Sequence, residues 1–359
     1  MLIGRAPVRI SFGGGGTDLQ DYYNDYGGLV LSATINKYVY GILTPNPDGH
    51  CQLISADYQR IMVGGPRTKP AAGELRLVKA VLDEFKAPYS TNVFLASEVP
   101  PGTGLGSSGA VVVNLLNILA TLYAKPLSRQ GIAELAYRVE SGRLGAPIGK
   151  QDQYASAFGG INCIKFSRHR VYVEPLRLPE ATVRRLQRNL ILFFTGNSRS
   201  AWDILRAQQE STRDKAPLVL DVLHRIKHLA VEMKKALEAG DLQRFGQLLD
   251  ESWQLKKHLS PIISNPLIDD AYATARLHGA LGGKITGAGG GGCLVLYCEE
   301  DAQPDVRRVL RSKGLQQMEF AFEFEGARII MNTSGPARRP EVQHERRANL
   351  LSAALPRPR

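Results

Sequence analysis

Cysteine is scarce in this sequence, with four residues in a chain of 359. They are Cys51, Cys163, Cys293 and Cys298; no two of them form a CxxC pair, and no histidine stands beside them at metal-ligand spacing. A disulfide framework is therefore not expected in so long a chain. This cysteine usage favours a reducing, cytoplasmic location.

Long apolar runs are also missing. The most apolar helical segment, AVVVNLLNILATLY at residues 110–123, is too short to span a bilayer and contains Asn114 and Asn117. The N-terminal MLIGRAPVRISF has neither the apolar length nor the small-residue cleavage site of a signal peptide. We therefore expect no membrane partner, and we interpret residues 110–123 as a buried core helix.

Acidic residues are fewer than basic ones, 34 Asp and Glu against 45 Lys and Arg, which gives a net charge of +11. Residues 336–359 carry +4 of this charge and are rich in proline and arginine, so we expect a disordered tail there. The rest of the chain would attract anions, either nucleic acid or phosphorylated metabolites with a nucleotide. The basic residues are scattered and form no aromatic-interleaved stripe, so an RNA-binding module is only a distant alternative.

A glycine-rich loop, PPGTGLGSSGA at residues 100–110, lacks the lysine of the common nucleotide-binding loop. It also fails the dinucleotide fingerprint, because no acidic residue follows about 20 positions later. Its glycines nevertheless precede the apolar helix directly. Free backbone N–H groups at a helix start, approached closely through glycine, make an anion site. We interpret the loop as a phosphate cradle; the alternative is a flexible turn that caps the helix.

The hydrophobic periodicity predicts an α+β chain in two domains. Strand-like segments fill the first hundred residues, and NPDGH at residues 46–50 predicts a hairpin between KYVYGILT and CQLISA. A helix capped by Ser128 and strand-like residues 153–175 are also expected. We place the domain boundary near residue 180, which gives domains at residues 1–180 and 181–335 and the tail at 336–359.

The second domain is expected to consist mainly of amphipathic helices between strands. The predicted strands cover residues 189–196 and 318–325, and a third follows the glycines of KITGAGGGGCLVLYC. The predicted helices lie at residues 199–213, 217–239, 241–258, 266–279 and 304–313.

Two further glycine clusters accompany the central loop: RAPVRISFGGGGTDL at residues 5–19 and KITGAGGGGCLVL at residues 284–296. Three such clusters in this order resemble the GHMP small-molecule kinases over about residues 1–330. The resemblance implies a ribosomal S5 domain 2-like N-terminal domain and a ferredoxin-like C-terminal domain, with ATP and Mg²⁺ as cofactors. It assigns the ATP phosphates to Pro101, Gly102, Thr103, Gly104, Leu105, Gly106, Ser107 and Ser108.

Within that superfamily, GKQDQYASAFGG at residues 149–160 and TGNSRSAWDIL at residues 195–205 resemble the branch that acts on D-glycero-D-manno-heptose 7-phosphate. The resemblance implies phosphorylation of the anomeric hydroxyl, which gives heptose 1,7-bisphosphate. L-Fucokinase-type enzymes share part of this pattern, so L-fucose or another hexose is the alternative acceptor. The sequence leaves the oligomeric state open.

The same resemblance gives roles to individual residues. Asp152 matches the catalytic base that accepts or orients the sugar hydroxyl proton, and Arg9 lies where a basic residue stabilises the developing charge. Glu140 matches the magnesium ligand, with Ser108 supplying a hydroxyl. The structural alternatives are a helix-start carboxylate for Asp152, a surface arginine for Arg9 and a solvated helix face for Glu140.

The resemblance assigns the acceptor sugar to residues of the first glycine cluster, which include Gly15 and Gly16, to one residue of the third cluster, and to residues outside the clusters. Asp18 matches the ligand of the sugar hydroxyls; the alternative is a cap of the local turn. Galactokinases carry Glu-His where this chain has Gly15 and Gly16, which puts a galactose-type contact in doubt. The remaining predicted contacts are Thr17, Lys150, Gly289 and Arg199 with its neighbours Ser198 and Ser200, where arginine would hold a phosphate already on the substrate.

Overall fold

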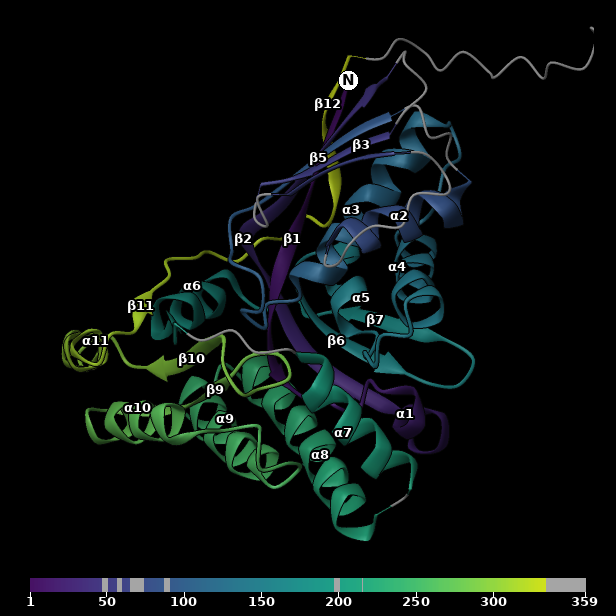
Figure 1. The fold of residues 1–359 in the computed structure, drawn as a ribbon. Coiled ribbons are helices and arrows are strands. Elements are labelled where there is room, and N and C mark those ends of the chain that lie inside the picture. Colours follow the sequence, from purple (N-terminus) through teal and green to yellow (C-terminus); the bar gives the residue numbers. More distant parts are fainter. Residues whose placement is uncertain are drawn as a thin grey trace, which may run out of the picture.

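The computed structural model describes residues 1–46, 51–56, 60–64, 74–86, 91–196, 201–214 and 216–333. Within these residues the chain forms two β-sheets with helices packed on them, so the predicted α+β class is confirmed (Figure 1). The predicted tail lies outside the described residues. Of the helices described, none combines the length and the apolarity needed to cross a bilayer.

The first sheet has eight strands within the described residues and is organised around two long ones. β1 and β2 pair in antiparallel fashion along their length, from Leu2 opposite Leu43 to Gly13 opposite Leu31. On its other edge β2 pairs first with β6 and then with β5. The strands are β1 (Leu2–Gly13), β2 (Gly28–Pro45), β3 (Cys51–Ser55), β4 (Arg60–Gly64), β5 (Thr91–Ser97), β6 (Ile161–Phe166), β7 (Val171–Pro175) and β12 (Arg328–Asn332).

One face of this sheet is covered by helices, as Figure 1 shows. The apolar segment predicted as a core helix is α3, and Asn114 is buried within it. The Asn114 amide donates to the carbonyls of Gly4 in β1 and Val39 in β2, at 3.0 and 3.2 Å. The first sheet and the helices that accompany it form the first half of the molecule. These helices are α1 (Gln20–Tyr26), α2 (Glu74–Phe85), α3 (Ser107–Leu122), α4 (Arg129–Tyr137), the π-helical segment η1 (Arg138–Arg143) and α5 (Gln151–Phe158).

The second sheet has four strands in the order β11-β8-β10-β9, with antiparallel pairing. The strands are β8 (Leu190–Phe194), β9 (Ala280–Ile285), β10 (Cys293–Cys298) and β11 (Gln316–Gln317). The helices are α6 (Glu180–Asn189), α7 (Ala201–Arg213), α8 (Pro217–Ala239), α9 (Leu242–Lys257), α10 (Pro266–Leu277) and α11 (Gln303–Ser312). α6 begins at Glu180, and the domain boundary near residue 180 stays a prediction. β12 returns from the end of the chain's described part to pair with β1 in the first sheet.

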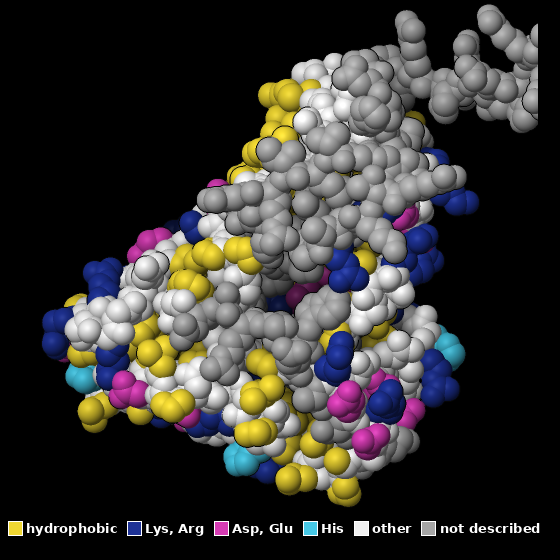
Figure 2. Space-filling model, viewed as in Figure 1, with side chains coloured by type: hydrophobic (Ala, Val, Ile, Leu, Met, Phe, Trp, Pro, Cys, Tyr) yellow, Lys and Arg dark blue, Asp and Glu magenta, His cyan; other side chains and the backbone are white. Residues whose placement is uncertain are grey.

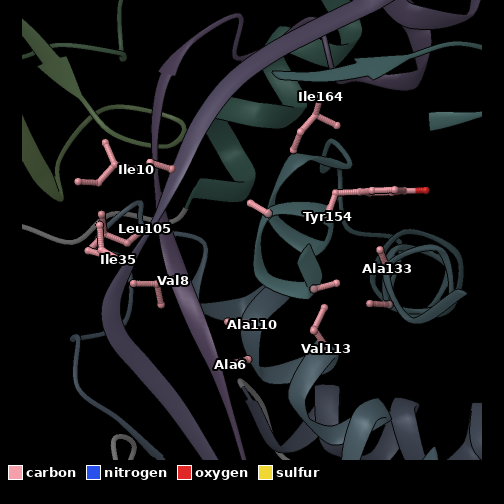
Figure 3. Close-up of a cluster of buried hydrophobic side chains, with 14 of the residues drawn as sticks. Ala6, Val8, Ile10, Ile35, Leu105, Ala110, Val113, Ala133, Tyr154 and Ile164 are labelled. Atoms are coloured by element: carbon pink, nitrogen blue, oxygen red, sulfur yellow. The ribbon is translucent and has the colours of Figure 1, made fainter. Parts of the chain in front are cut away.

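A continuous apolar core fixes these layers. In Figure 3, Val8 and Ile10 of β1 lie near Leu105, while Ala110 and Val113 of α3 lie on the side of Tyr154 and Ala133. The same buried cluster extends into α8 and α9, where Met233 and Phe245 are fully buried. The two halves are therefore held by shared packing as well as by the returning β12.

Three local predictions are wrong. KYVYGILT and CQLISA do not form a hairpin, because β5 lies between β2 and β3 in the sheet. Residues 153–158 are helical and belong to α5; the strands of that region begin only at Ile161. Residues 318–325 form no regular strand, because this segment crosses between the sheets: Met318 N–H donates to Leu192 of β8, and Glu323 N–H donates to Thr34 of β2.

Candidate active site

A cavity of about 490 Å³ opens between the two halves of the molecule. The first half lines it with β1, the loop at residues 101–108, η1 and the start of α5, and the second half with α9, β9 and Gly287. Figure 2 shows acidic and basic atoms together in the depth of a central hollow. A cavity of this size with convergent polar groups is the expected place for a small-molecule site.

The glycine-rich loop forms one wall of this cavity. Gly106 is the N-cap of α3 with a φ of 77°, and a Cβ there would lie 3.1 Å from Asp152 Cγ, so both conformation and space require glycine. The start of α3 thus faces the cavity, where its unpaired N–H groups can hold phosphate. The predicted residues that line the cavity are Pro101, Gly102, Gly104, Gly106, Ser107 and Ser108.

Two predicted residues of this loop lie beneath it. Thr103 and Leu105 are fully buried and do not line the cavity. The Thr103 carbonyl accepts the N–H of Cys293 at 2.9 Å, and the Leu105 carbonyl accepts the N–H of Arg9 at 2.8 Å. They therefore fix the loop against β10 and β1, and a direct ATP contact through their side chains has no geometric support.

Arg9, which is buried, and Asp152, whose side chain is 29% exposed, form an ion pair at the cavity. Arg9 Nε and one terminal nitrogen donate to the same oxygen, Asp152 Oδ1, at 2.9 and 2.6 Å, and the other terminal nitrogen donates to the Gly104 carbonyl at 2.6 Å. No donor among the described residues bonds Asp152 Oδ2. One carboxylate oxygen is thus fixed by Arg9 while the second remains available to a ligand.

Asp18 lies beside this pair and is held by backbone and amide donors. Its Oδ1 accepts the N–H of Gly16 at 3.0 Å, and its Oδ2 accepts the backbone N–H and the side-chain amide of Gln151 at 3.2 and 3.1 Å. Burial raises the pKa of Asp18 above its ordinary value, and the charge of Asp152 acts in the same direction. Gly149 permits this arrangement, because a Cβ there would lie 1.9 Å from Asp18 Oδ2.

Glu140 and Ser108 meet at the start of α3. The Ser108 hydroxyl donates to Glu140 Oε1, and the Gln153 amide donates to Oε2 at 2.5 Å. Burial raises the pKa of Glu140 to about 7; the two hydrogen bonds oppose this rise and the charge of Asp152 adds to it. The predicted solvated helix face is therefore wrong as an alternative, since Glu140 is only 3% exposed.

Comparison with known proteins decides the family. The pattern of the GHMP kinase N-terminal domain matches residues 75–160, and that of the GHMP kinase C-terminal domain matches residues 233–316. D-glycero-alpha-D-manno-heptose 7-phosphate kinase of Campylobacter jejuni is 33% identical over 90% of this chain and 97% of that enzyme. The chain belongs to the GHMP kinase family. It is an ATP-dependent kinase, and the predicted two-domain fold of that family is confirmed.

Two other relatives of this GHMP kinase are named for different acceptors. The solved structure of a D-glycero-D-manno-heptose 1-phosphate kinase from Bacteroides thetaiotaomicron superposes with a TM-score of 0.76 at 30% identity, over 93% of this chain and all of that one. A bifunctional fucokinase/GDP-fucose pyrophosphorylase of Arabidopsis thaliana is 26% identical over 85% of this chain and 30% of that protein. The named substrates of these proteins therefore differ.

Several predicted acceptor contacts of this GHMP kinase lie apart from the cavity. Thr17 is fully buried, and its hydroxyl donates to Gly14 and Leu29 carbonyls at 2.8 and 3.0 Å. Lys150 pairs with Glu134 at 3.0 Å, and its ammonium lies over the rings of Tyr23 and Tyr137. Neither these two nor Gly289 lines the cavity, whereas Gly15 and Gly16 do. Ser198, Arg199 and Ser200 lie outside the described residues.

Sequence reasoning missed three cations in the cavity wall: the exposed Arg76 of α2 and two buried lysines. Lys256 of α9 and Lys284 of β9 line the cavity and are 6% and 3% exposed. Lys284 could have been suspected, because it stands in an otherwise apolar strand directly before a glycine cluster. Lys256 is followed by Lys257 on an amphipathic helix, and nothing in that pattern distinguishes the buried lysine from its partly exposed neighbour.

Proposed function

We propose that this protein transfers the terminal phosphoryl group of ATP to the anomeric hydroxyl of D-glycero-D-manno-heptose 7-phosphate. The chain is an ATP-dependent sugar kinase of the GHMP family, and the proposal adds the sugar, the hydroxyl and the residues. The observation that carries it is the Arg9–Asp152 pair, which joins the glycine-rich loop to Asp18 in one cavity. Full-length similarity to a heptose 7-phosphate kinase supports the choice of sugar.

Asp152 is proposed to act on the acceptor hydroxyl. Because Arg9 fixes Oδ1, the available Oδ2 can accept the hydrogen bond of that hydroxyl. It can then take the hydroxyl proton as the bond from the sugar oxygen to the γ-phosphorus forms and the bond from that phosphorus to the ADP oxygen breaks. Asp18, the predicted sugar ligand, lies in the same wall and would orient the ring through other hydroxyls. Phosphoryl transfer depends mainly on such positioning and on charge stabilisation.

Arg9 is proposed to stabilise charge on the transferring group. Its guanidinium bridges Asp152 and the carbonyl of Gly104 in the phosphate loop, so it lies where acceptor and phosphate would meet. The N–H groups at the start of α3 hold the remaining phosphates. This arrangement needs no lysine in the loop.

The residues at the start of α3 fit Mg²⁺. Ser108 and Glu140 offer a hydroxyl and a carboxylate oxygen, the donor types that Mg²⁺ prefers, and both line the cavity beside the loop. No cluster of three or more His, Cys, Asp or Glu side chains suited to a metal occurs among the described residues, so the remaining ligands would be water and phosphate oxygens. When bound, the ion would neutralise phosphate charge.

A panel of acceptors tests the proposal. Purified protein, ATP and Mg²⁺ are mixed with D-glycero-D-manno-heptose 7-phosphate, the heptose 1-phosphate, L-fucose and galactose, and ADP release is followed in a coupled assay. We expect turnover on the 7-phosphate, with phosphorus NMR showing a new anomeric phosphate. Preference for the 1-phosphate or for L-fucose would overturn the choice of acceptor.

The Asp152→Asn variant tests the catalytic base. The amide cannot accept a proton, so we expect kcat to fall by about 10²–10⁴-fold while ATP still binds. Retention of ATP binding, measured by calorimetry, separates this effect from misfolding. Near-normal turnover of the variant would refute the role of Asp152.

A location in the cytoplasm remains part of the proposal, because ATP and sugar phosphates are cytoplasmic metabolites.

A further inference from the structure

The proposed mechanism leaves two buried cations unused. Lys256 donates to the Gly287 carbonyl, and Lys284 donates to the Phe12 carbonyl at 3.2 Å. Neither ammonium is within ion-pair distance of a carboxylate among the residues that the structure describes. A buried ammonium without a counter-charge is costly, and this cost is offset when an anion binds.

A third polar group in the same wall also lacks a partner. The Ser11 hydroxyl is buried, lines the cavity and has no hydrogen-bond partner within the described part of the chain. Gly15 lies next to this hydroxyl, since a Cβ at that position would be in van der Waals contact with Ser11 Oγ at 3.8 Å. Buried hydroxyls are normally hydrogen-bonded, so an unsatisfied one that faces a cavity indicates a missing ligand.

Ser11 and Lys284 lie along β1 beyond Arg9. The Arg9 backbone N–H donates to the Leu105 carbonyl of the phosphate loop. Ser11 follows two residues later on the same face of β1, which places it about 7 Å farther along the strand. The Lys284 ammonium donates to the carbonyl of Phe12, the residue after Ser11, and Asp18 lies in the segment that follows β1. Ser11 and Lys284 therefore flank the region assigned to the acceptor sugar.

We infer that Lys256, Lys284 and Ser11 form a subsite for the phosphate group that the acceptor already carries. This rests on the proposed function, because it deepens the choice of a phosphorylated acceptor. Two ammonium groups match the double negative charge of a phosphate monoester, and the hydroxyl supplies a further hydrogen bond. The predicted cationic pocket thus comes from α9 and β9, whereas Lys150 is paired with Glu134.

A competing assignment is the transferring phosphoryl group. Gly287, the partner of Lys256, packs against Gly104 of the phosphate loop, where a Cβ on Gly287 would lie 2.7 Å from Gly104 Cα. Lys256 therefore lies closer to the ATP side than Lys284 and Ser11 do. A test must separate loss of acceptor binding from loss of ATP binding.

Calorimetric binding of two acceptors to the nucleotide-free protein makes this separation. The acceptors are D-glycero-D-manno-heptose 7-phosphate and the same heptose without phosphate. Lys284→Met and Ser11→Ala should weaken binding of the 7-phosphate by about 10–100-fold and about 3–10-fold, the usual size for charged and neutral hydrogen bonds. Binding of the unphosphorylated heptose and of ATP should change by less than about twofold.

Controls and opposite outcomes complete the test. Lys257→Met removes the neighbouring lysine, which pairs with Asp269 at 3.7 Å away from the cavity lining, and should leave all three affinities unchanged. Equal loss for both acceptors, weaker ATP binding in Lys284→Met, or no preference of the wild type for the phosphorylated sugar would each overturn the subsite. Binding without turnover would contradict the proposed function and leave the subsite supported.

Discussion

Lys256 gives a prediction in which removal of a charge stabilises the protein. Burial lowers the pKa of Lys256 from its ordinary value of 10.5 to about 8; the charge of Arg9 adds to this and that of Asp18 opposes it. One pKa unit corresponds to about 1.4 kcal/mol, so the folded state is penalised by about 3 kcal/mol at pH 7. Lys256→Met removes this penalty and loses one hydrogen bond worth about 1 kcal/mol. We expect a net gain of about 2 kcal/mol in the free energy of unfolding.

The pH dependence of this gain follows from proton linkage. Below about pH 8 the lysine is charged in both states, and the full penalty applies. Between about pH 8 and 10.5 the folded lysine has lost its proton while the unfolded one keeps it, so wild-type stability rises with pH relative to the variant. The advantage of Lys256→Met should therefore be largest at pH 7 and shrink by pH 10.

Urea unfolding of both proteins at several pH values between 7 and 10, without nucleotide or sugar, measures this difference. Lys257→Met serves as the matched control, and we expect its unfolding free energy to stay within about 0.5 kcal/mol of wild type. A destabilised Lys256→Met at pH 7, or a difference that is constant with pH, would refute the reasoning that burial of the ammonium is costly.

Two further predictions concern the carboxylates of the cavity. Glu140→Gln keeps the shape of the side chain but removes the charge beside Ser108. We expect the Mg²⁺ concentration for half-maximal activity to rise about tenfold or more, with the KM for the acceptor unchanged. An unaltered Mg²⁺ requirement would contradict the metal role. Gly149→Ala places a Cβ 1.9 Å from Asp18 Oδ2. We expect the free energy of unfolding, measured with urea, to fall by about 1–3 kcal/mol and the KM for the acceptor to rise. A fully stable variant would show that Asp18 can move aside.

The fold was predictable where a pattern is local. The buried helix α3, the cap at Ser128, which accepts the Gly131 N–H, and the long helices of the second half follow from periodicity and capping. Strand pairing was not predictable in the same way. β2 ends at Pro45, and residues 47–50 of the predicted turn lie outside the described residues. The partner of β2 at this end is β5, nearly fifty positions later, because pairing is decided by the tertiary core.

The same difference between local patterns and tertiary packing applies to the residues of the candidate site. Asp152, Arg9, Glu140 and Ser108 were each named through a sequence motif, and the structure brings them to one cavity; their chemical roles remain predictions. Lys256 and Lys284 were not predicted from the sequence, because burial of a lysine depends on which elements pack over it. Conversely, Lys150 belongs to a motif, yet its ammonium forms an ion pair with Glu134. Motif membership locates backbone segments, and side-chain direction is decided by packing.

The carboxylates of the cavity and its two buried lysines come from different halves of the molecule. Asp18, Glu140 and Asp152 come from elements of the first half, whereas Lys256 and Lys284 come from α9 and β9 in the second. The groups proposed to handle the hydroxyl and the metal ion therefore belong to the first half. Of the groups proposed to hold the acceptor phosphate, the two ammonium groups belong to the second half and Ser11 of β1 belongs to the first. A phosphorylated sugar would bind both halves at once, and its charge would offset the buried ammonium groups that destabilise the free protein. Its binding should stabilise the whole chain more than binding of the unphosphorylated sugar does.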